Sequence, residues 1–229
     1  MSGSPQPVRG RAGPPFGSEK ARRTYETLVS ATRESIRDEG TFSPARVAER
    51  AGVAAATFYA YFSSREDALA AAFEQILEEF HARTVSWLSI EALLEDGLEE
   101  VCRTFAWKVV RFYEADHGTF RLALSRLSTD RSIRDVVRRS QSEGLEHIER
   151  FLTLGMAAGK VRPGDAAKLG MAMLVLVQGL NNPLLMRPDA EHQGGTIELL
   201  ADALHQLLAL HPAARDGESS APLSKSVYE

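Results

Sequence analysis

The chain of 229 residues contains a single cysteine, Cys102, and its longest apolar run is Met171–Val177. One cysteine excludes a disulfide framework and a cysteine-based metal cluster, and it is typical of proteins from a reducing compartment. A run of this length is far shorter than the roughly 20 apolar residues that a membrane span needs. Residues 1–18 lack the apolar core of a secretory signal. We therefore expect a cytoplasmic protein with no membrane partner.

Sequence signatures of common enzyme sites are also missing. The chain has no Gly-rich phosphate loop, no H-E-x-x-H and no G-x-S-x-G motif. Glu143 and His147 have the i, i+4 spacing of one helix face, but a single pair does not make a metal site, and a solvated face explains it. We expect no catalytic residue, no metal and no cofactor.

Charge is unevenly distributed along the chain, whose net charge is −4. Residues 1–65 hold ten Lys and Arg against six Asp and Glu, whereas the remainder holds seventeen against twenty-five. The overall charge argues against a general nucleic-acid binder, but a basic N-terminal part on an acidic body would direct one end of the protein toward DNA. Chance unevenness is the alternative explanation.

Apolar periodicity predicts an all-α protein of about nine helices. We expect a flexible basic arm over 1–18, a helix-turn-helix domain over 19–66, a helical ligand-binding and dimerisation domain over 67–211, and a disordered tail over 212–229. Arg9 and Arg11 of the arm either reach DNA or belong to a solvated tail. Besides two short helices within 43–62, the expected helices span about 19–39, 65–87, 90–115, 118–127, 131–158, 163–181 and 191–210.

The segment 43–69 is the most informative part of the sequence. Ser43 followed by Pro44 is typical of a helix start, and Gly52 can adopt the left-handed conformation that ends a helix. Phe58 and Phe62 are four residues apart and would share the buried side of the next helix. The layout predicts two short helices around a tight turn, as in helix-turn-helix DNA readers.

The start of the following helix has two possible caps, Ser63-x-x-Glu66 and Ser64-x-x-Asp67, and the sequence does not choose between them. Arg65 would lie in the first turn, where a positive charge opposes the helix dipole. Such a cation beside the helix N–H groups would bind a phosphate. A solvated arginine is the alternative interpretation.

Short motifs in this segment resemble the DNA-binding domain of the TetR family of one-component transcriptional regulators, from roughly Ala21 to Leu69. The residues that carry the resemblance are Ala51-Gly52-Val53, Thr57-Phe58-Tyr59, Tyr61-Phe62 and Ser64-Arg65, with Leu69 beyond. The resemblance implies that the side chains at four positions contact operator phosphates or nearby bases, namely Thr57, Tyr59, Tyr61 and Arg65.

The chain departs from the family at position 54, where Ser or Thr usually caps the recognition helix and this chain has Ala54 followed by Ala55 and Ala56. Loss of such a cap costs about 1 kcal/mol, so we expect a weakly ordered helix. The helix also lacks the Arg, Lys, Asn or Gln side chains that read guanine and adenine edges. Alanines offer only apolar contact to thymine methyl groups. Base reading then depends on Thr57, Tyr59, the preceding helix start or DNA shape. The expected DNA-facing set is Ser43, Arg46, Ala55, Ala56, Thr57, Tyr59, Ala60, Tyr61 and Arg65.

The two C-terminal helices are the expected dimer interface. The segment 163–181 is apolar nearly all round, which predicts burial on every side, and 191–210 carries a leucine stripe. Two such helices can form a four-helix bundle with their symmetry mates, as TetR-like proteins usually do. A homodimer would place two recognition helices about 34–36 Å apart, or farther, on a palindrome.

The sequence also predicts a ligand pocket in the larger helical domain. Ligand pockets and protein cores are both mostly apolar, so core packing competes with ligand contact at each position. Gln178 either orients a ligand or bonds across the dimer. The expected pocket residues are Phe105, Trp107, Phe112, Phe120, Phe151, Met171, Met173 and Gln178.

These features favour a homodimeric repressor that binds double-stranded operator DNA and is released by a small, lipophilic effector. An activator or a corepressor-dependent regulator of the same fold is the first alternative. A helical ligand-binding protein or enzyme is the second.

Overall fold

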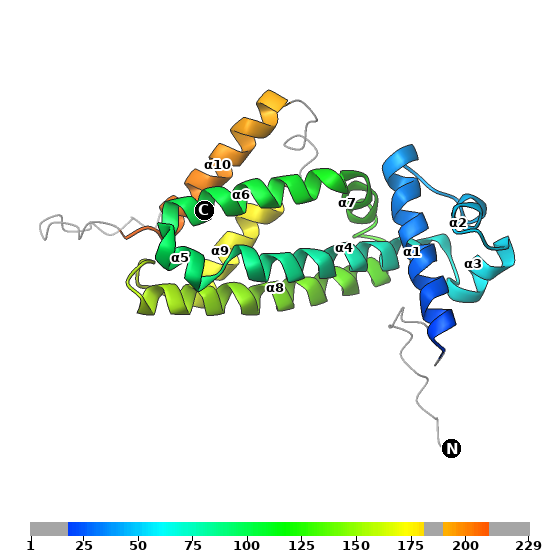
Figure 1. Cartoon of the computed structure of the whole chain (residues 1–229), viewed down its shortest axis with the longest axis horizontal. Helices are drawn as coiled ribbons and strands as arrows, with labels where there is room; N and C mark the ends of the chain where they lie inside the picture. The colour runs from blue at the N-terminus through cyan, green and yellow to red at the C-terminus, as the bar shows by residue number, and fades with distance from the viewer. Residues whose placement is uncertain (1–17, 181–189, 211–229) are drawn as a thin grey trace, which may run out of the picture.

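The computed structural model describes residues 18–180 and 190–210, and the expected arm and tail lie outside these residues apart from Ser18 (Figure 1). All secondary structure in the described part is α-helical, which confirms the all-α fold. The helices are α1 Glu19–Glu39, α2 Pro44–Arg50, α3 Ala55–Tyr61, α4 Arg65–Trp87, α5 Ile90–Glu95, α6 Gly97–Ala115, α7 His117–Leu124, α8 Arg131–Ala157, α9 Ala166–Gly179 and α10 Ala190–Leu208.

Helices α1, α2 and α3 form a small head at one end of the molecule (Figure 1). Ser18 begins α1 by accepting a hydrogen bond from the backbone N–H of Ala21, and Gly40 ends it with φ 69°. Both bounds of this helix agree with the sequence prediction. The head core includes Leu28, Val47, Phe58 and Phe62, which are almost completely buried.

Helix α4 leads from the head into a larger body, where it packs beside α8. Helix α9 packs on α8, and α10 packs chiefly on α6. Cys102 is buried in α6, and burial raises the pKa of its thiol to about 12, so the thiol is protonated at neutral pH. None of the helices in residues 18–180 and 190–210 is long and apolar enough to cross a membrane.

Two predictions for the body need correction. The single helix expected over 90–115 is broken between α5 and α6, because Gly97 adopts a left-handed backbone with φ 83°. The helix expected over 163–181 is the shorter α9, and it is not buried on every side of the single chain. Leu169, Met173 and Val177 are buried, but Met171 and Val175 are exposed, because α8 and α10 leave one side of α9 uncovered.

Candidate DNA-binding face and effector cavity

The turn between α2 and α3 is built around Gly52, which has φ 68°. The backbone N–H of Gly52 donates to the carbonyl of Glu49 at 3.0 Å, and that of Val53 donates to the carbonyl of Ala48 at 2.9 Å. These bonds reverse the chain tightly, so α3 packs directly against α2. The Phe58 and Phe62 rings lie 5.2 Å apart and hold the inner side of α3 in the head core, as their spacing predicted.

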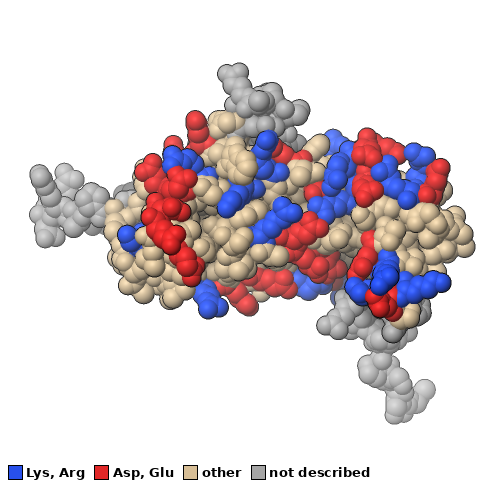
Figure 2. All heavy atoms as spheres, in the orientation of Figure 1, with Lys and Arg blue, Asp and Glu red and all other residues tan. Residues whose placement is uncertain are grey.

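The outer side of α3 is small and uncharged. Ala55, Ala56 and Ala60 are exposed, and Tyr59 projects from among them with 61% of its surface accessible. Ala54 occupies the N-cap position with extended backbone and, as an alanine, supplies no side-chain hydrogen bond. In Figure 2 the tip of the molecule where α3 lies is tan, with blue and red side chains above and below it.

Two of the residues predicted to contact DNA are less exposed than the alanines and Tyr59 on the outer side of α3. Thr57 is half-buried on α3. Tyr61 is also half-buried, with its ring 6.4 Å from that of Tyr25 on α1. Tyr61 therefore lies at the junction of α1 and α3, whereas Tyr59 stands clear of the head.

Arg65 begins α4 but folds back over the loop between α1 and α2. Its Nη2 donates to the Oγ1 of Thr41 at 2.8 Å, and its guanidinium lies 4.7 Å from the centre of the Phe42 ring. The α4 cap is Ser64, whose Oγ accepts from the backbone N–H of Asp67 at 3.0 Å, which decides between the two frames. The side chain of Arg65 thus bridges two parts of the head, and its phosphate contact stays a prediction.

The arginines of α2 are paired with carboxylates on the head itself. Arg46 lies 3.1 Å from both Glu39 and Glu49, and Arg50 lies 2.6 Å from Asp38. Ser43 caps α2 by accepting from the backbone N–H of Arg46 at 3.4 Å. Any contact of Arg46 with DNA would compete with these carboxylates.

The body encloses a narrow cavity of about 80 Å³ between α4, α6, α7, α8 and α9. Of the residues expected from the sequence, Phe105, Phe120 and Gln178 line it. The sequence prediction missed the wall that α4 supplies, although the apolar face of α4 was visible in its periodicity. From α8 it named Phe151, whereas other residues of α8 line the cavity. These additional lining residues include Phe73, Leu77, Phe80, His81, Val137, Ser140 and Gln141.

The other expected pocket residues lie outside this cavity. Trp107 is 51% exposed on α6 and Met171 is 48% exposed on α9, because each lies on the outward side of its helix. Neither lines the cavity. Phe112, Phe151 and Met173 are buried in the core but do not line the cavity.

His81 is the most polar feature of the cavity wall. Its Nε2 lies 3.1 Å from the Oγ of Ser140, and its Nδ1 lies 3.3 Å from Glu143. These contacts orient the ring between α4 and α8. The cavity is therefore apolar over most of its wall, with a few hydrogen-bonding groups from His81, Ser140, Gln141 and Gln178.

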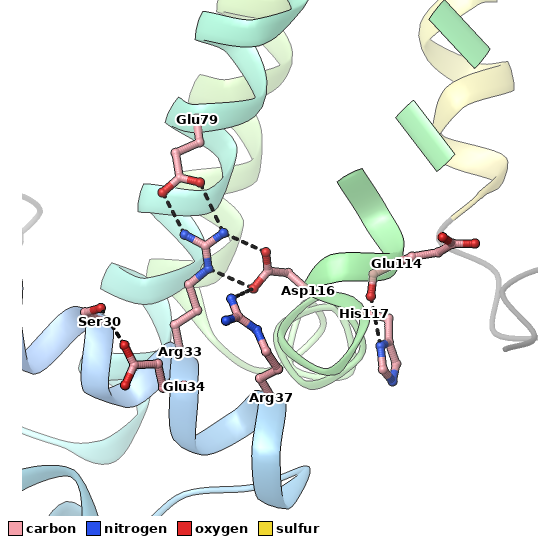
Figure 3. A network of polar contacts seen from close by, with 8 residues as sticks. All are labelled: Ser30, Arg33, Glu34, Arg37, Glu79, Glu114, Asp116 and His117. Atoms are coloured by element: carbon pink, nitrogen blue, oxygen red, sulfur yellow. Dashed lines mark hydrogen bonds and ion pairs between the residues drawn. The ribbon is translucent and has the colours of Figure 1, made fainter. Parts of the chain in front are cut away.

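An ionic cluster around the buried Asp116 joins the head to the body (Figure 3). Arg33 of α1 forms a two-pronged pair with Glu79 of α4, at 2.6 and 3.1 Å, and a second with Asp116, at 2.7 and 2.6 Å. Arg37 adds a bond to Asp116 at 3.3 Å. The side chain of Asp116 is 1% exposed. Burial alone would raise the pKa of Asp116, but the hydrogen bonds and charges of Arg33 and Arg37 hold it below its ordinary value.

The corner between α6 and α7 also contacts α1 through Gly118. A Cβ atom at this glycine would lie 3.3 Å from the backbone oxygen of Ile36, so a larger residue would push α7 away from α1. Tyr113 and Phe120, on either side of the corner, line the cavity. The cavity wall and the head–body contact therefore share the same short segment of chain.

The chain is similar to known regulators in sequence and in fold. A family model described as "Bacterial regulatory proteins, tetR family" matches residues 28–72. The fatty acid metabolism regulator protein of Bacillus subtilis (strain 168) is 24% identical over 163 residues, which cover 68% of this chain and 80% of the relative.

Solved structures share the fold at low identity. A TetR transcription regulator from Haloarcula marismortui has a TM-score of 0.65 at 16% identity, and the match covers 81% of this chain and 98% of that one. The regulator FadR from Bacillus subtilis, solved in complex with stearoyl-CoA, has a TM-score of 0.56 at 20% identity, with 79% and 100% covered.

Proposed function

We propose that this chain, which matches a model of the TetR family of bacterial regulatory proteins over residues 28–72, is a dimeric repressor released from a palindromic operator by a lipophilic effector. The observation that carries the proposal is the outer side of α3, which lies at the free end of the molecule behind a tight turn. A short helix presented in this way fits the major groove. Its site of action would be the cytoplasm, where a bacterial chromosome lies.

Exposed apolar side chains on α9 and α10 support the dimer. These two helices pack against each other, yet Met171, Val175 and Leu199 are 48%, 60% and 67% exposed. Large apolar side chains of this kind are typical of surfaces that another protein covers. Pairing of α9 and α10 with a second copy would bury them in a four-helix bundle. One head reads only a few base pairs, so two heads are needed for a palindrome.

The apolar cavity supports a lipophilic effector, and the relatives suggest its chemical class. The curated relative is named for fatty acid metabolism, and FadR was solved with stearoyl-CoA. We propose an effector with a long acyl chain, whose chain enters the cavity. Ligand pockets usually measure roughly 300–1,000 Å³, whereas this cavity measures about 80 Å³. Binding would therefore have to spread the helices that form its wall.

The ionic cluster supplies a route from the cavity to the head. Spreading the wall at Tyr113 and Phe120 would move the α6–α7 corner, and with it Asp116. Arg33 would carry this movement to α1, while α4 moves with Glu79. The heads would then be wrongly spaced for the operator. The effector shifts this equilibrium only by the difference between its affinities for the two arrangements.

A DNA-release assay with purified protein tests the proposal. Operator fragments are first selected from the source genome, and stearoyl-CoA is then added to the preformed complex, with coenzyme A alone as the control. We expect release by the acyl thioester only, and a weaker response from a Val137→Phe variant that fills part of the cavity. Tighter binding on addition of the ligand would instead identify a corepressor-dependent regulator. Absence of sequence-specific DNA binding would contradict the proposal.

A further inference from the structure

The exposed side of α3 has an unusual chemical character for a DNA reader. Three of its four exposed side chains are the methyl groups of Ala55, Ala56 and Ala60, and the fourth is the phenol of Tyr59. The helix carries no charged residue. The nearest arginines of α2, Arg46 and Arg50, are already held by carboxylates of the head.

The major groove offers each side chain a limited set of partners. Guanine, adenine and cytosine present hydrogen-bond donors and acceptors, which a methyl group cannot recognise. Thymine also presents an apolar feature, its C5 methyl group. A methyl-lined helix that lies against the base edges would therefore gain energy from each thymine methyl group that it covers, whereas a G·C pair offers it no methyl group.

We propose that each head reads its half-site chiefly through thymine methyl groups, which pack against the alanine face of Ala55, Ala56 and Ala60. The inference rests on the proposed DNA-binding function, and it adds the chemistry by which the operator is chosen. Tyr59 stands among the alanines and is the polar side chain most exposed on this face. Its hydroxyl fixes the register of the helix against a base or a phosphate, while the methyl contacts select thymines.

Replacement of thymine by deoxyuridine tests the proposal directly, because uracil lacks only the C5 methyl group and keeps the same base pairing. Deoxyuridine is placed singly at each thymine of a selected half-site, and at thymines outside the footprint as a control. Burial of one methyl group predicts a loss of roughly two- to fourfold in affinity for each contacted thymine. The control substitutions should leave affinity unchanged.

A double-mutant cycle assigns the contact to the protein. Ala55→Gly, Ala56→Gly and Ala60→Gly each remove one methyl group but also weaken the helix. The weakened helix lowers the affinity equally for thymine DNA and for deoxyuridine DNA. The difference between the affinity losses measured on the two DNAs therefore isolates the methyl contact. Ala157→Gly, an exposed alanine near the end of α8, is the matched control. Where an alanine contacts a thymine, we expect the Ala→Gly change and the deoxyuridine substitution at that thymine to have non-additive effects on affinity.

The outcomes separate this inference from the proposed function. Coupling at one or more of the three alanines supports thymine reading. Sequence-specific binding that is unchanged by every deoxyuridine substitution overturns the inference and leaves the DNA-binding function standing. Absence of specific binding to any duplex overturns both.

Discussion

At the scale of single residues, the head combines a conventional frame with an unusual surface. The frame could be predicted from sequence because caps and turns depend on local residues, such as Ser43 before Pro44 and Gly52 after α2. Ala54 is the exception, since it stands where a hydrogen-bonding side chain would begin α3. The choice between two caps for α4 could not be made, because Ser63 and Ser64 have equivalent local patterns.

Restoring the missing cap should stabilise the head. Ala54 already has the extended backbone that an N-cap residue needs, with φ −67° and ψ 147°. We expect Ala54→Ser to raise the free energy of unfolding of the head by about 1 kcal/mol. Urea denaturation monitored by circular dichroism measures this change, with Ala157→Ser as the control. An unchanged or lower stability would show that α3 does not need the cap.

Arg65 allows a phosphate contact to be distinguished from a structural role. If it binds a phosphate, Arg65→Ala should weaken binding to all duplexes and reduce the slope of log affinity against log salt by about 1. If it only bridges Thr41 and Phe42, the variant should lower stability and leave the salt slope unchanged. Arg65→Lys keeps the positive charge but loses the forked guanidinium group, so it should leave the slope of log affinity against log salt unchanged. A slope unchanged in Arg65→Ala would contradict the phosphate contact.

At the scale of helices, local sequence patterns predicted where each helix begins and ends better than they predicted which helices pack against each other. The bounds of α1 were predicted correctly because Gly40 marks its end, and the expected span of α4 agrees with the structure although its cap could not be chosen. The break at Gly97 was missed, since an isolated glycine within a helical pattern is often tolerated. Most of the cavity wall was also missed, because periodicity gives the apolar face of a helix but not which helix covers it. The pair of Arg33 and Asp116, far apart in sequence, has no local signal.

The ionic cluster should make stability depend on pH in the acid range. The pKa of Asp116 is lower in the folded protein, so its contribution is present above the ordinary aspartate pKa of about 3.9 and is lost as pH falls through the folded value. At pH 7 we expect Asp116→Asn to lower the free energy of unfolding by about 2 kcal/mol, because Arg33 loses its charged hydrogen bonds to Asp116 but keeps its pair with Glu79. The difference between the two proteins should shrink below pH 4. Thermal unfolding at a series of pH values measures it.

A control for this substitution lies two residues away. Glu114 pairs with the exposed Arg111, and Glu114→Gln should have little effect on stability or on its pH dependence. If Asp116 couples the cavity to the head, Asp116→Asn should also blunt the release of DNA by the effector. A fully retained response would restrict the cluster to a structural role.

At the scale of the whole molecule, the exposed apolar residues of α9 and α10 suggest that the single chain is half of the functional unit. We expect Val175→Arg or Leu199→Arg to shift the protein toward the monomer and to weaken operator binding, because a buried unpaired charge opposes association. Leu94→Arg is the matched control, since Leu94 is similarly exposed on α5. Analytical ultracentrifugation measures the association state. Dimers that persist in both variants would place the interface elsewhere.

The central claim, that two heads of one dimer read a palindrome, is tested most directly by measuring the affinity of the purified protein for the selected operator. The duplexes compared are the full palindrome, a single half-site and a scrambled sequence, at the same moderate salt concentration. The predicted result is one dimer bound to the palindrome, about a thousandfold or more tighter than to the scrambled duplex, with the half-site bound much more weakly than the palindrome. Equal affinity for all three duplexes would contradict the account.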